Sequence, residues 1–236
     1  MHWDTPVKPA ELAEQRIITA ILDGSFEINS NLPAERELSI KVGVTRPTLR
    51  EALQRLSRDG WIEIRQGKPT RVKDFWSEGN LNILSSIARY SNHLSLDFVK
   101  NLLQIRYLLC PTYAAMAAEK KPELIIDFLN RAPSKNDPAE VYSEYDFLLH
   151  QKLTQGSENP IFTMILNGFK ELFTQKAIIY FEKEEPRKHS YHFYQELLIA
   201  FKEGDFQKVF MVSQKVMAES ILFWDDISFE KENPDE

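Results

Sequence analysis

Two arginines and two threonines crowd the start of a predicted helix in the stretch GVTRPTLREAL, residues 43–53. Threonine hydroxyls and arginine guanidinium groups bind phosphate oxygens, and the arginine fork also matches the acceptor edge of guanine. A helix N-terminus adds unpaired backbone N–H groups, which favour an anion. These residue types therefore indicate recognition of a polyanion, while a routine cap on a buried helix is the simpler alternative.

The charge distribution supports a polyanion partner for this part of the chain only. The net charge is −6 over 236 residues, yet residues 36–73 contain ten Lys/Arg against four Asp/Glu. Residues 76–236 contain 17 basic and 24 acidic residues. Such asymmetry indicates two domains with different partners, although clustering on a solvated face would also produce it.

Other kinds of chemistry find little support. The lone cysteine, Cys110, excludes an intramolecular disulfide and a multi-cysteine metal site. We find no nucleophile–base constellation and no glycine loop for a cofactor phosphate, so we expect no enzyme and no cofactor. No apolar run reaches the roughly 18–20 residues that cross a bilayer, and the N-terminus does not resemble a signal peptide. We therefore expect a cytoplasmic protein with no membrane partner.

The elements that position the first stretch are three short helices. Residues 10–22 repeat apolar side chains at helical spacing, and a second helix is expected at about 34–42. Gly43 supplies a tight turn, and Thr45 is a plausible N-cap for the third helix, which places Pro47 in a first turn that loses no hydrogen bond. A helix, a glycine turn and a helix make a helix-turn-helix, whose second helix enters the major groove.

After Gly60 the pattern changes to period two. Residues 61–65 and 69–73 are predicted as two strands, and residues 66–68 as the turn between them. This wing would present a set of cations to a minor groove or to flanking phosphates, namely Arg65, Lys68, Arg71 and Lys73. A solvated hairpin is the alternative, which the preceding helix-turn-helix makes less favourable.

The rest of the chain is predicted as a series of helices. The expected spans are about 79–90, 96–118, 122–131, 138–154, 160–182, 187–203 and 206–224. The fold class is therefore mainly α: a winged helix-turn-helix domain followed by an all-α helical bundle. We expect the DNA-binding domain at residues 1–74, a short linker at 75–79 and the bundle at 80–230, for which the resemblance described next implies a ligand-binding, effector role.

At this point the residues carry a resemblance to a known family. The run LPAERELSIKVGVTRPTLREALQRLSRDGWIEIRQGKPTRV resembles the winged helix of GntR-type bacterial repressors, and more narrowly that of FadR-like regulators. The likeness continues into KDFWSEGNLNIL and returns in NPIFTMILNGFKELFTQ. It implies a homodimeric transcriptional regulator of fatty acid metabolism that long-chain acyl-CoA releases from a double-stranded DNA operator. Repression of fatty acid degradation genes is implied, with activation of biosynthesis genes as a further expectation.

The resemblance also implies which residues contact the operator. Matching positions lie on the first helix of the motif, at the start of the second helix and at the wing tip: Arg36, Thr45, Arg46, Thr48, Arg50, Gln66, Gly67 and Lys68. Two positions depart from the family pattern, since Pro47 replaces a threonine and Gln66 replaces a histidine. These departures bear on operator preference.

A second set of residues is implied for the acyl-CoA site. Arg106 would be a charged partner at the pocket, and Leu102 and Tyr194 would form apolar wall. The thioester and pantetheine region would be lined by Tyr180, Ser220 and Trp224. Met217 stands where FadR-like proteins have glycine, which would narrow the slot or shift the pantetheine path.

The alternative within the same family is a repressor that senses a metal-bound small organic acid. Asp146 and His150 are spaced i,i+4 on one helix face, as in the first two metal ligands of many GntR relatives. His189 and His192 are further candidates, but Tyr194 stands where a third ligand is expected. Two ligands do not complete a site, so we expect no bound metal and a structural role for His150.

Overall fold

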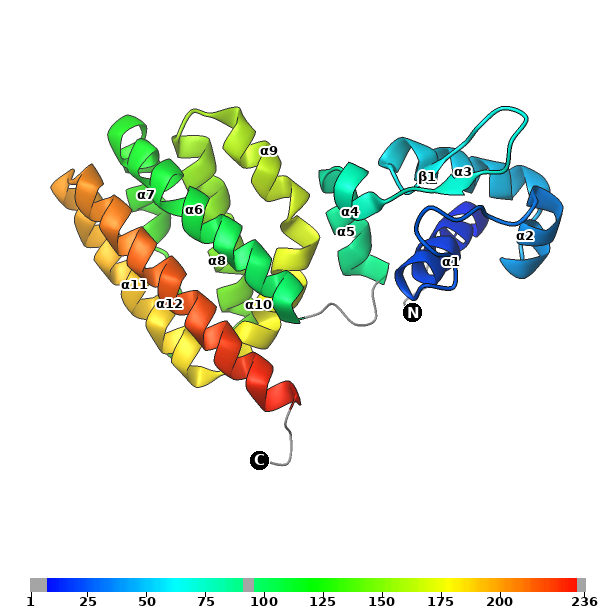
Figure 1. Cartoon of the computed structure of the whole chain (residues 1–236). Coiled ribbons are helices and arrows are strands. Elements are labelled where there is room, and N and C mark those ends of the chain that lie inside the picture. Colours follow the sequence, from blue (N-terminus) through cyan, green and yellow to red (C-terminus); the bar gives the residue numbers. More distant parts are fainter. Residues whose placement is uncertain (1–7, 91–95, 233–236) are drawn as a thin grey trace, which may run out of the picture. The chain divides into compact units, whose positions relative to one another are not determined.

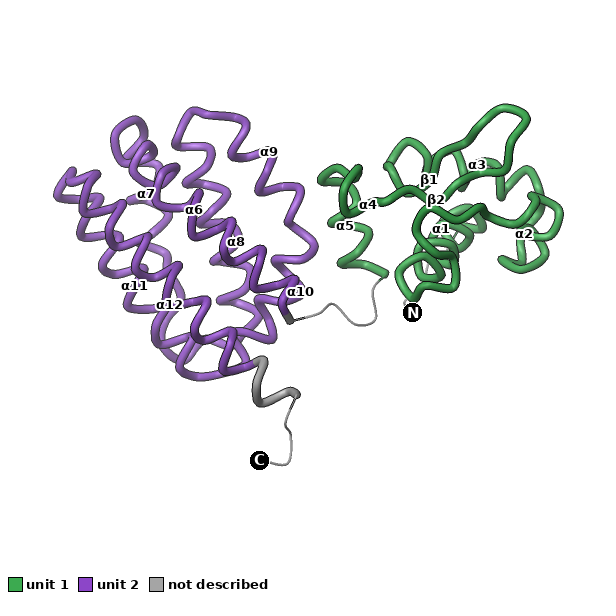
Figure 2. Tube along the Cα trace, in the orientation of Figure 1, with its two compact units in different colours: residues 1–93 green, residues 94–236 purple. Residues whose placement is uncertain are grey.

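A computed structural model describes residues 8–90 and 96–232 of the chain. The chain divides into two compact units, residues 1–93 and residues 94–236 (Figure 1, Figure 2). The N-terminal part carries the only paired strands among the described residues, and the described secondary structure of the C-terminal part is all helical.

Unit 1 begins with three helices that share one core. They are α1 (Pro9–Leu22), α2 (Glu35–Lys41) and α3 (Arg46–Asp59). The apolar stripe predicted for α3 is confirmed, because Leu49, Ala52, Leu53 and Leu56 are all buried. They pack with Ala13 and Ile17 of α1, which are fully buried. The helix pair α2–α3 and the turn at Gly43 make the predicted helix-turn-helix.

The start of α3 has the predicted cap. Thr45 is the N-cap, and its hydroxyl accepts a hydrogen bond from the backbone N–H of Thr48 at 3.4 Å. Pro47 lies in the first turn of α3, where a backbone N–H has no acceptor within the helix. The proline therefore costs no intrahelical hydrogen bond. Gly60, with φ of 98°, ends the helix in the left-handed conformation that suits glycine.

The wing is shorter than predicted. Its strands β1 (Ile62–Glu63) and β2 (Arg71–Val72) are antiparallel, with Ile62 opposite Val72, and each has two residues where five were expected. Asn31 forms an isolated bridge with Arg71 on the other side of β2. The period-two pattern identified the hairpin, but only its base is held by ladder hydrogen bonds.

The first unit continues beyond the expected linker. A four-residue helix, α4 (Phe75–Glu78), is capped by Asp74, and α5 (Leu81–Tyr90) follows it. Phe75 is buried against Trp61, with ring centroids 4.8 Å apart, and Ile83 and Ile87 are also buried. Because these apolar contacts belong to the winged helix, the compact unit extends to residue 93, whereas we had expected the effector domain to begin at residue 80.

Unit 2 contains seven helices among its described residues. They are α6 (Leu96–Lys120), α7 (Pro122–Leu129), α8 (Ala139–Gly156), α9 (Pro160–Gly168), α10 (Lys170–Glu182), α11 (Glu184–Glu203) and α12 (Phe206–Glu232). The long helices α6 and α12 run antiparallel, and an ion pair of 2.7 Å joins Lys100 near the start of α6 to Asp225 of α12 (Figure 1). α6 also packs on α8, which is buried along most of its length. The single helix predicted for residues 160–182 is broken at Phe169 into α9 and α10.

Candidate functional site

The start of α3 presents its polar side chains to solvent. Thr45 and Arg46 are exposed, Thr48 is half-buried, and the two threonine hydroxyls lie 2.8 Å apart. The first turn of α3 contains no acidic residue of its own, which favours an anion at this N-terminus. The arrangement suits a phosphate or a base edge at the helix start.

Three of the expected DNA contacts are unpaired cations. Arg36 of α2, Arg46 of α3 and Lys68 of the wing are exposed, and none has an ion-pair partner in residues 8–90 and 96–232. Arg50 differs, because its Nε lies 2.8 Å from Oε2 of Glu35. In Figure 1 the wing loop, α2 and the start of α3 lie toward the same end of unit 1.

The wing tip is a tight turn. The backbone N–H of Lys68 donates to the carbonyl of Arg65 at 3.2 Å, and Gly67 has φ of 71°, a conformation that favours glycine. Gln66, Gly67 and Lys68 are all exposed. The turn therefore presents one amide and one ammonium group to solvent, as a groove contact requires.

The other cations of the wing do not face solvent freely, which corrects the interpretation made from sequence. Arg65 donates to the side chain of Asn31 and to the carbonyl of Pro69, both at 3.0 Å. Arg71 lies 3.2 Å from the carboxylate of Glu63, and Lys73 lies 3.2 Å from that of Glu78 on α4. These side chains stabilise the wing itself. Arg71 and Lys73 are paired with carboxylates of unit 1, whereas Arg65 is held by two neutral oxygens and lies 3.9 Å from the carboxylate of Glu63.

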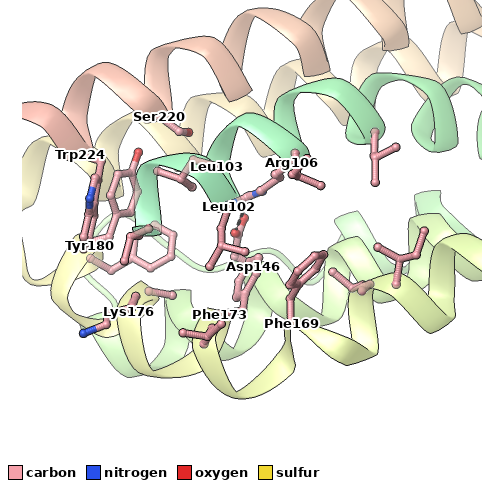
Figure 3. A pocket seen from close by; sticks show the side chains of 18 of the residues that line it. Leu102, Leu103, Arg106, Asp146, Phe169, Phe173, Lys176, Tyr180, Ser220 and Trp224 are labelled. Atoms are coloured by element: carbon pink, nitrogen blue, oxygen red, sulfur yellow. Dashed lines mark hydrogen bonds and ion pairs between the residues drawn. The ribbon is translucent and has the colours of Figure 1, made fainter. Parts of the chain in front are cut away.

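Unit 2 contains an apolar slot with a cavity volume of about 110 Å³. α6, α9, α10 and α12 contribute its walls, and α9 has no buried residue. Apolar side chains make most of the lining, among them Val99, Leu103, Leu109, Phe162, Ile165 and Leu166. Figure 3 shows Tyr180, Ser220 and Trp224 at one end of the slot, with Arg106 and Asp146 further along it.

The structure brings five of the six expected ligand residues together. Leu102, Arg106, Tyr180, Ser220 and Trp224 all line the slot. Tyr194 does not line it: the side chain is fully buried behind Asp146, and its hydroxyl donates to Oδ1 of Asp146 at 3.0 Å. Met217 also lies in the core of the bundle rather than in the wall of the slot.

A chain of buried polar groups begins at the slot. Nη2 of Arg106 donates to Oδ2 of Asp146 at 2.8 Å and lies 2.5 Å from Nε2 of His150. Nδ1 of His150 lies 2.6 Å from the hydroxyl of Tyr113 and 3.7 Å from the thiol of Cys110. Burial, reinforced by the charge of Arg106, holds the pKa of His150 well below its usual range.

Two buried polar atoms at the slot, Nε of Arg106 and the hydroxyl of Tyr180, have no well-aligned hydrogen-bond partner among the described residues, although Ser220 lies close enough to the Tyr180 hydroxyl to lower its pKa. Burial raises the pKa of Tyr180 to about 12, so its hydroxyl stays protonated at neutral pH. A buried donor without an acceptor costs about 1–3 kcal/mol, so both atoms favour a ligand that carries acceptors.

The candidate metal ligands are occupied by other groups. The guanidinium of Arg106 lies against both Asp146 and His150, where it would repel a metal cation. His189 lies 2.7 Å from the carboxylate of Glu219, and His192 is exposed. No group of three metal-ligating side chains gathers in the part of the chain that the structure describes.

Comparison with known proteins places these features in a family. The family model described as the FadR C-terminal domain matches residues 73–233, and that of the bacterial regulatory proteins of the gntR family matches residues 9–72. A fatty acid metabolism regulator protein of Shewanella sp. (strain ANA-3) is 43% identical over 84% of this chain and 82% of its own length. That of Shewanella oneidensis is 42% identical over 85% of this chain and 84% of its own length. The chain belongs to the FadR family of gntR-type regulators.

Membership in the FadR family confirms the expected fold class and makes the chain a DNA-binding transcriptional regulator rather than an enzyme. A solved structure of Lar, described as controlling the expression of the Listeria monocytogenes agr system, shares the fold with a TM-score of 0.65. It is 17% identical and covers 94% of this chain and 99% of that chain. No described helix of this FadR-family chain is long and apolar enough to span a membrane.

The sequence did not indicate every residue that shapes this site. Tyr113 and Lys176 line the slot but follow no distinctive motif. The phenylalanines at 162, 169 and 173 lie in the stretch NPIFTMILNGFKELFTQ that carries the resemblance, but the sequence did not indicate that they line a ligand slot. Asp146 and His150 were recognised by their spacing, but their partner Arg106 lies 40 residues away. Only the fold brings that guanidinium between them, and nothing in the local pattern indicates it.

Proposed function

We propose that this chain is a dimeric transcriptional regulator of fatty acid metabolism that long-chain acyl-CoA releases from its operator. The apolar slot in unit 2 carries the proposal, because it combines long aliphatic and aromatic walls with two unpartnered buried donors. The curated relatives, named fatty acid metabolism regulators, support the same reading. On this proposal the chain represses fatty acid degradation genes and also activates biosynthesis genes.

The dimensions of the slot support a coupling between ligand and DNA. Small-molecule sites occupy about 300–1,000 Å³, whereas this slot has a volume of about 110 Å³. An acyl chain therefore has to separate the walls, and α9, which has no buried residue, is the wall that moves most easily. A 100-fold loss of operator affinity requires about 2.7 kcal/mol of coupling between the two sites.

A homodimer is part of the proposal because paired half-sites about one helical turn apart match a two-fold symmetric protein. The residues proposed to contact each half-site are those at the start of α3, on α2 and at the wing tip. A cytoplasmic location follows from a DNA operator as partner.

A gel shift on a candidate operator, with and without long-chain acyl-CoA, tests the proposal. We expect retardation by the protein alone, and its loss on addition of the acyl-CoA. The competing proposal, a regulator of a metal-bound organic acid, predicts stoichiometric zinc or nickel that survives dialysis. The guanidinium between Asp146 and His150 argues against it. Retardation that acyl-CoA leaves unchanged would refute the acyl-CoA proposal.

A further inference from the structure

The contacts of Arg106 fix the protonation pattern of its buried neighbours. Its Nη2 carries two hydrogens and faces two acceptors, Oδ2 of Asp146 and Nε2 of His150. A guanidinium only donates, so Nε2 of His150 accepts and Nδ1 carries the ring hydrogen. That N–H then donates to the hydroxyl oxygen of Tyr113, 2.6 Å away.

We propose that His150 is a positioning residue for effector recognition. It takes the second hydrogen of Arg106 Nη2, so that the Nε–H of Arg106 remains as the donor for the carbonyl oxygen of an acyl thioester in the slot. This inference rests on the proposed function, because it identifies Nε of Arg106 as the atom that hydrogen-bonds the thioester carbonyl of the proposed acyl-CoA ligand.

Burial and charge explain why a neutral acceptor completes this site. Asp146 already neutralises Arg106, and the hydroxyl of Tyr194 occupies the other oxygen of Asp146. Nε of Arg106 is buried without a partner, and Arg106 lines a slot whose walls are mostly apolar. An uncharged carbonyl gives that donor a partner without adding a buried charge, which would be costly to desolvate.

His150 is placed to hold the guanidinium of Arg106 rather than to contact a ligand itself. Its side chain is fully buried, it packs edge-on against Tyr113, and its ring centroid lies 6.0 Å from that of Phe173. The same Phe173 ring lies 5.0 Å from the guanidinium carbon of Arg106. Oδ2 of Asp146 and Nε2 of His150 both contact Nη2 of Arg106, and the Phe173 ring lies against the guanidinium, so three neighbours hold the group in place.

Two ligands that differ at the carbonyl test the inference on the full-length chain. Palmitoyl-CoA has the thioester carbonyl, and S-hexadecyl-CoA has a methylene in its place. By calorimetry we expect the wild type to bind the thioester at least about 10-fold more tightly, as expected for a hydrogen bond from a charged donor. We expect His150→Phe to reduce that preference to near unity, and His150→Gln, which keeps an acceptor, to retain most of it.

His192→Phe is the matched control, because His192 is exposed on α11 and does not line the slot. It should keep the full preference for the thioester. If His150→Phe also keeps the full preference, His150 does not position Arg106 and the inference is wrong. If the wild type binds neither ligand, the proposed function fails, and the inference with it.

A direct measurement covers the case in which His150→Phe does not fold. Nitrogen-15 NMR of the labelled wild-type chain distinguishes the two tautomers of a neutral histidine, and His150→Gln identifies the resonance among five histidines. We expect a protonated Nδ1 and an unprotonated Nε2. A hydrogen on Nε2 would overturn the inference, because that nitrogen would then be unable to accept from Arg106.

Discussion

The Nε of Arg50 lies 2.8 Å from Oε2 of Glu35, although the two side chains are 66% and 42% exposed. Arg50 belongs to the face of α3 that we propose for DNA contact, and Glu35 is the first residue of α2. A carboxylate of unit 1 therefore competes with DNA phosphate for the same guanidinium.

Replacing that carboxylate should strengthen DNA binding in general. We expect Glu35→Gln to raise affinity for operator and scrambled DNA alike by about 2- to 5-fold, the range of an exposed ion pair. Fluorescence anisotropy on both DNAs measures the effect. Glu51→Gln, which removes an exposed partner of Arg55, serves as the control and should change neither affinity. Unchanged binding by Glu35→Gln would show that the ion pair does not restrain Arg50.

We expect Arg46 to contribute to operator specificity through a base contact, and not only to overall affinity through its charge. We expect Arg46→Ala to weaken operator binding by about 1–3 kcal/mol more than it weakens binding to scrambled DNA, because a bidentate contact to a base is lost. Titrations of both DNAs at one fixed salt concentration provide the comparison. Equal losses would instead make Arg46 a phosphate contact.

Lys68 and Arg71 should behave differently although both belong to the wing. Lys68 is exposed at the tip, whereas Arg71 is held by Glu63 and Asn29. We expect Lys68→Ala to reduce the slope of log affinity against log salt by about 0.9, the value for one phosphate contact. Arg71→Ala should lower thermal stability and leave that slope unchanged. A slope that falls in both variants would place Arg71 on the DNA.

Ser220 should affect the ligand response without affecting DNA binding. Its hydroxyl donates to the carbonyl of Val216 at 2.9 Å, and the side chain is buried at the slot. The larger side chain in Ser220→Asn would intrude on the ligand, so we expect higher acyl-CoA concentrations for release at unchanged operator affinity. A ligand titration that matches the wild type would remove Ser220 from the site.

The buried His150 should make stability depend on pH in a defined window. Its pKa lies well below the usual range in the folded chain because of burial, while the unfolded chain binds a proton near pH 6.5. Stability is therefore fully present above about pH 6.5 and falls as pH drops, by up to about 1.4 kcal/mol per pH unit. Thermal unfolding at several pH values should show a steeper loss for the wild type than for His150→Gln. Parallel curves would mean that His150 is protonated in the fold.

Local sequence signals predicted the elements of unit 1 because each depends on neighbouring residues. The cap at Thr45 and the tolerance of Pro47 follow from one helical turn, and both are confirmed. The ion pairs of the wing cations do not follow from neighbouring residues alone. Lys73 contacts Glu78 because a short helix, α4, forms in the expected linker. The charge count of residues 36–73 therefore overstates what the wing offers to DNA.

Prediction of the slot depended on the family more than on pattern. The six residues implied by the resemblance lie on four helices, and the five that meet at the slot come from α6, α10 and α12. Tyr194 shows the limit of that reasoning, because its hydroxyl binds Asp146 instead of facing a ligand. The position of a residue in the sequence indicates the helix on which it lies. The helices packed around it determine which group its polar atom hydrogen-bonds.

The small volume of the slot should determine which acyl chain lengths the regulator responds to. On the proposed function, parting the walls has a free-energy cost, and each methylene that the slot buries offsets it by about 0.8 kcal/mol. Because the slot has a volume of about 110 Å³ before the walls part, we expect short chains to offset less of that cost than long chains. We therefore expect release from the operator to require an acyl chain of a minimum length and to increase steeply beyond that length.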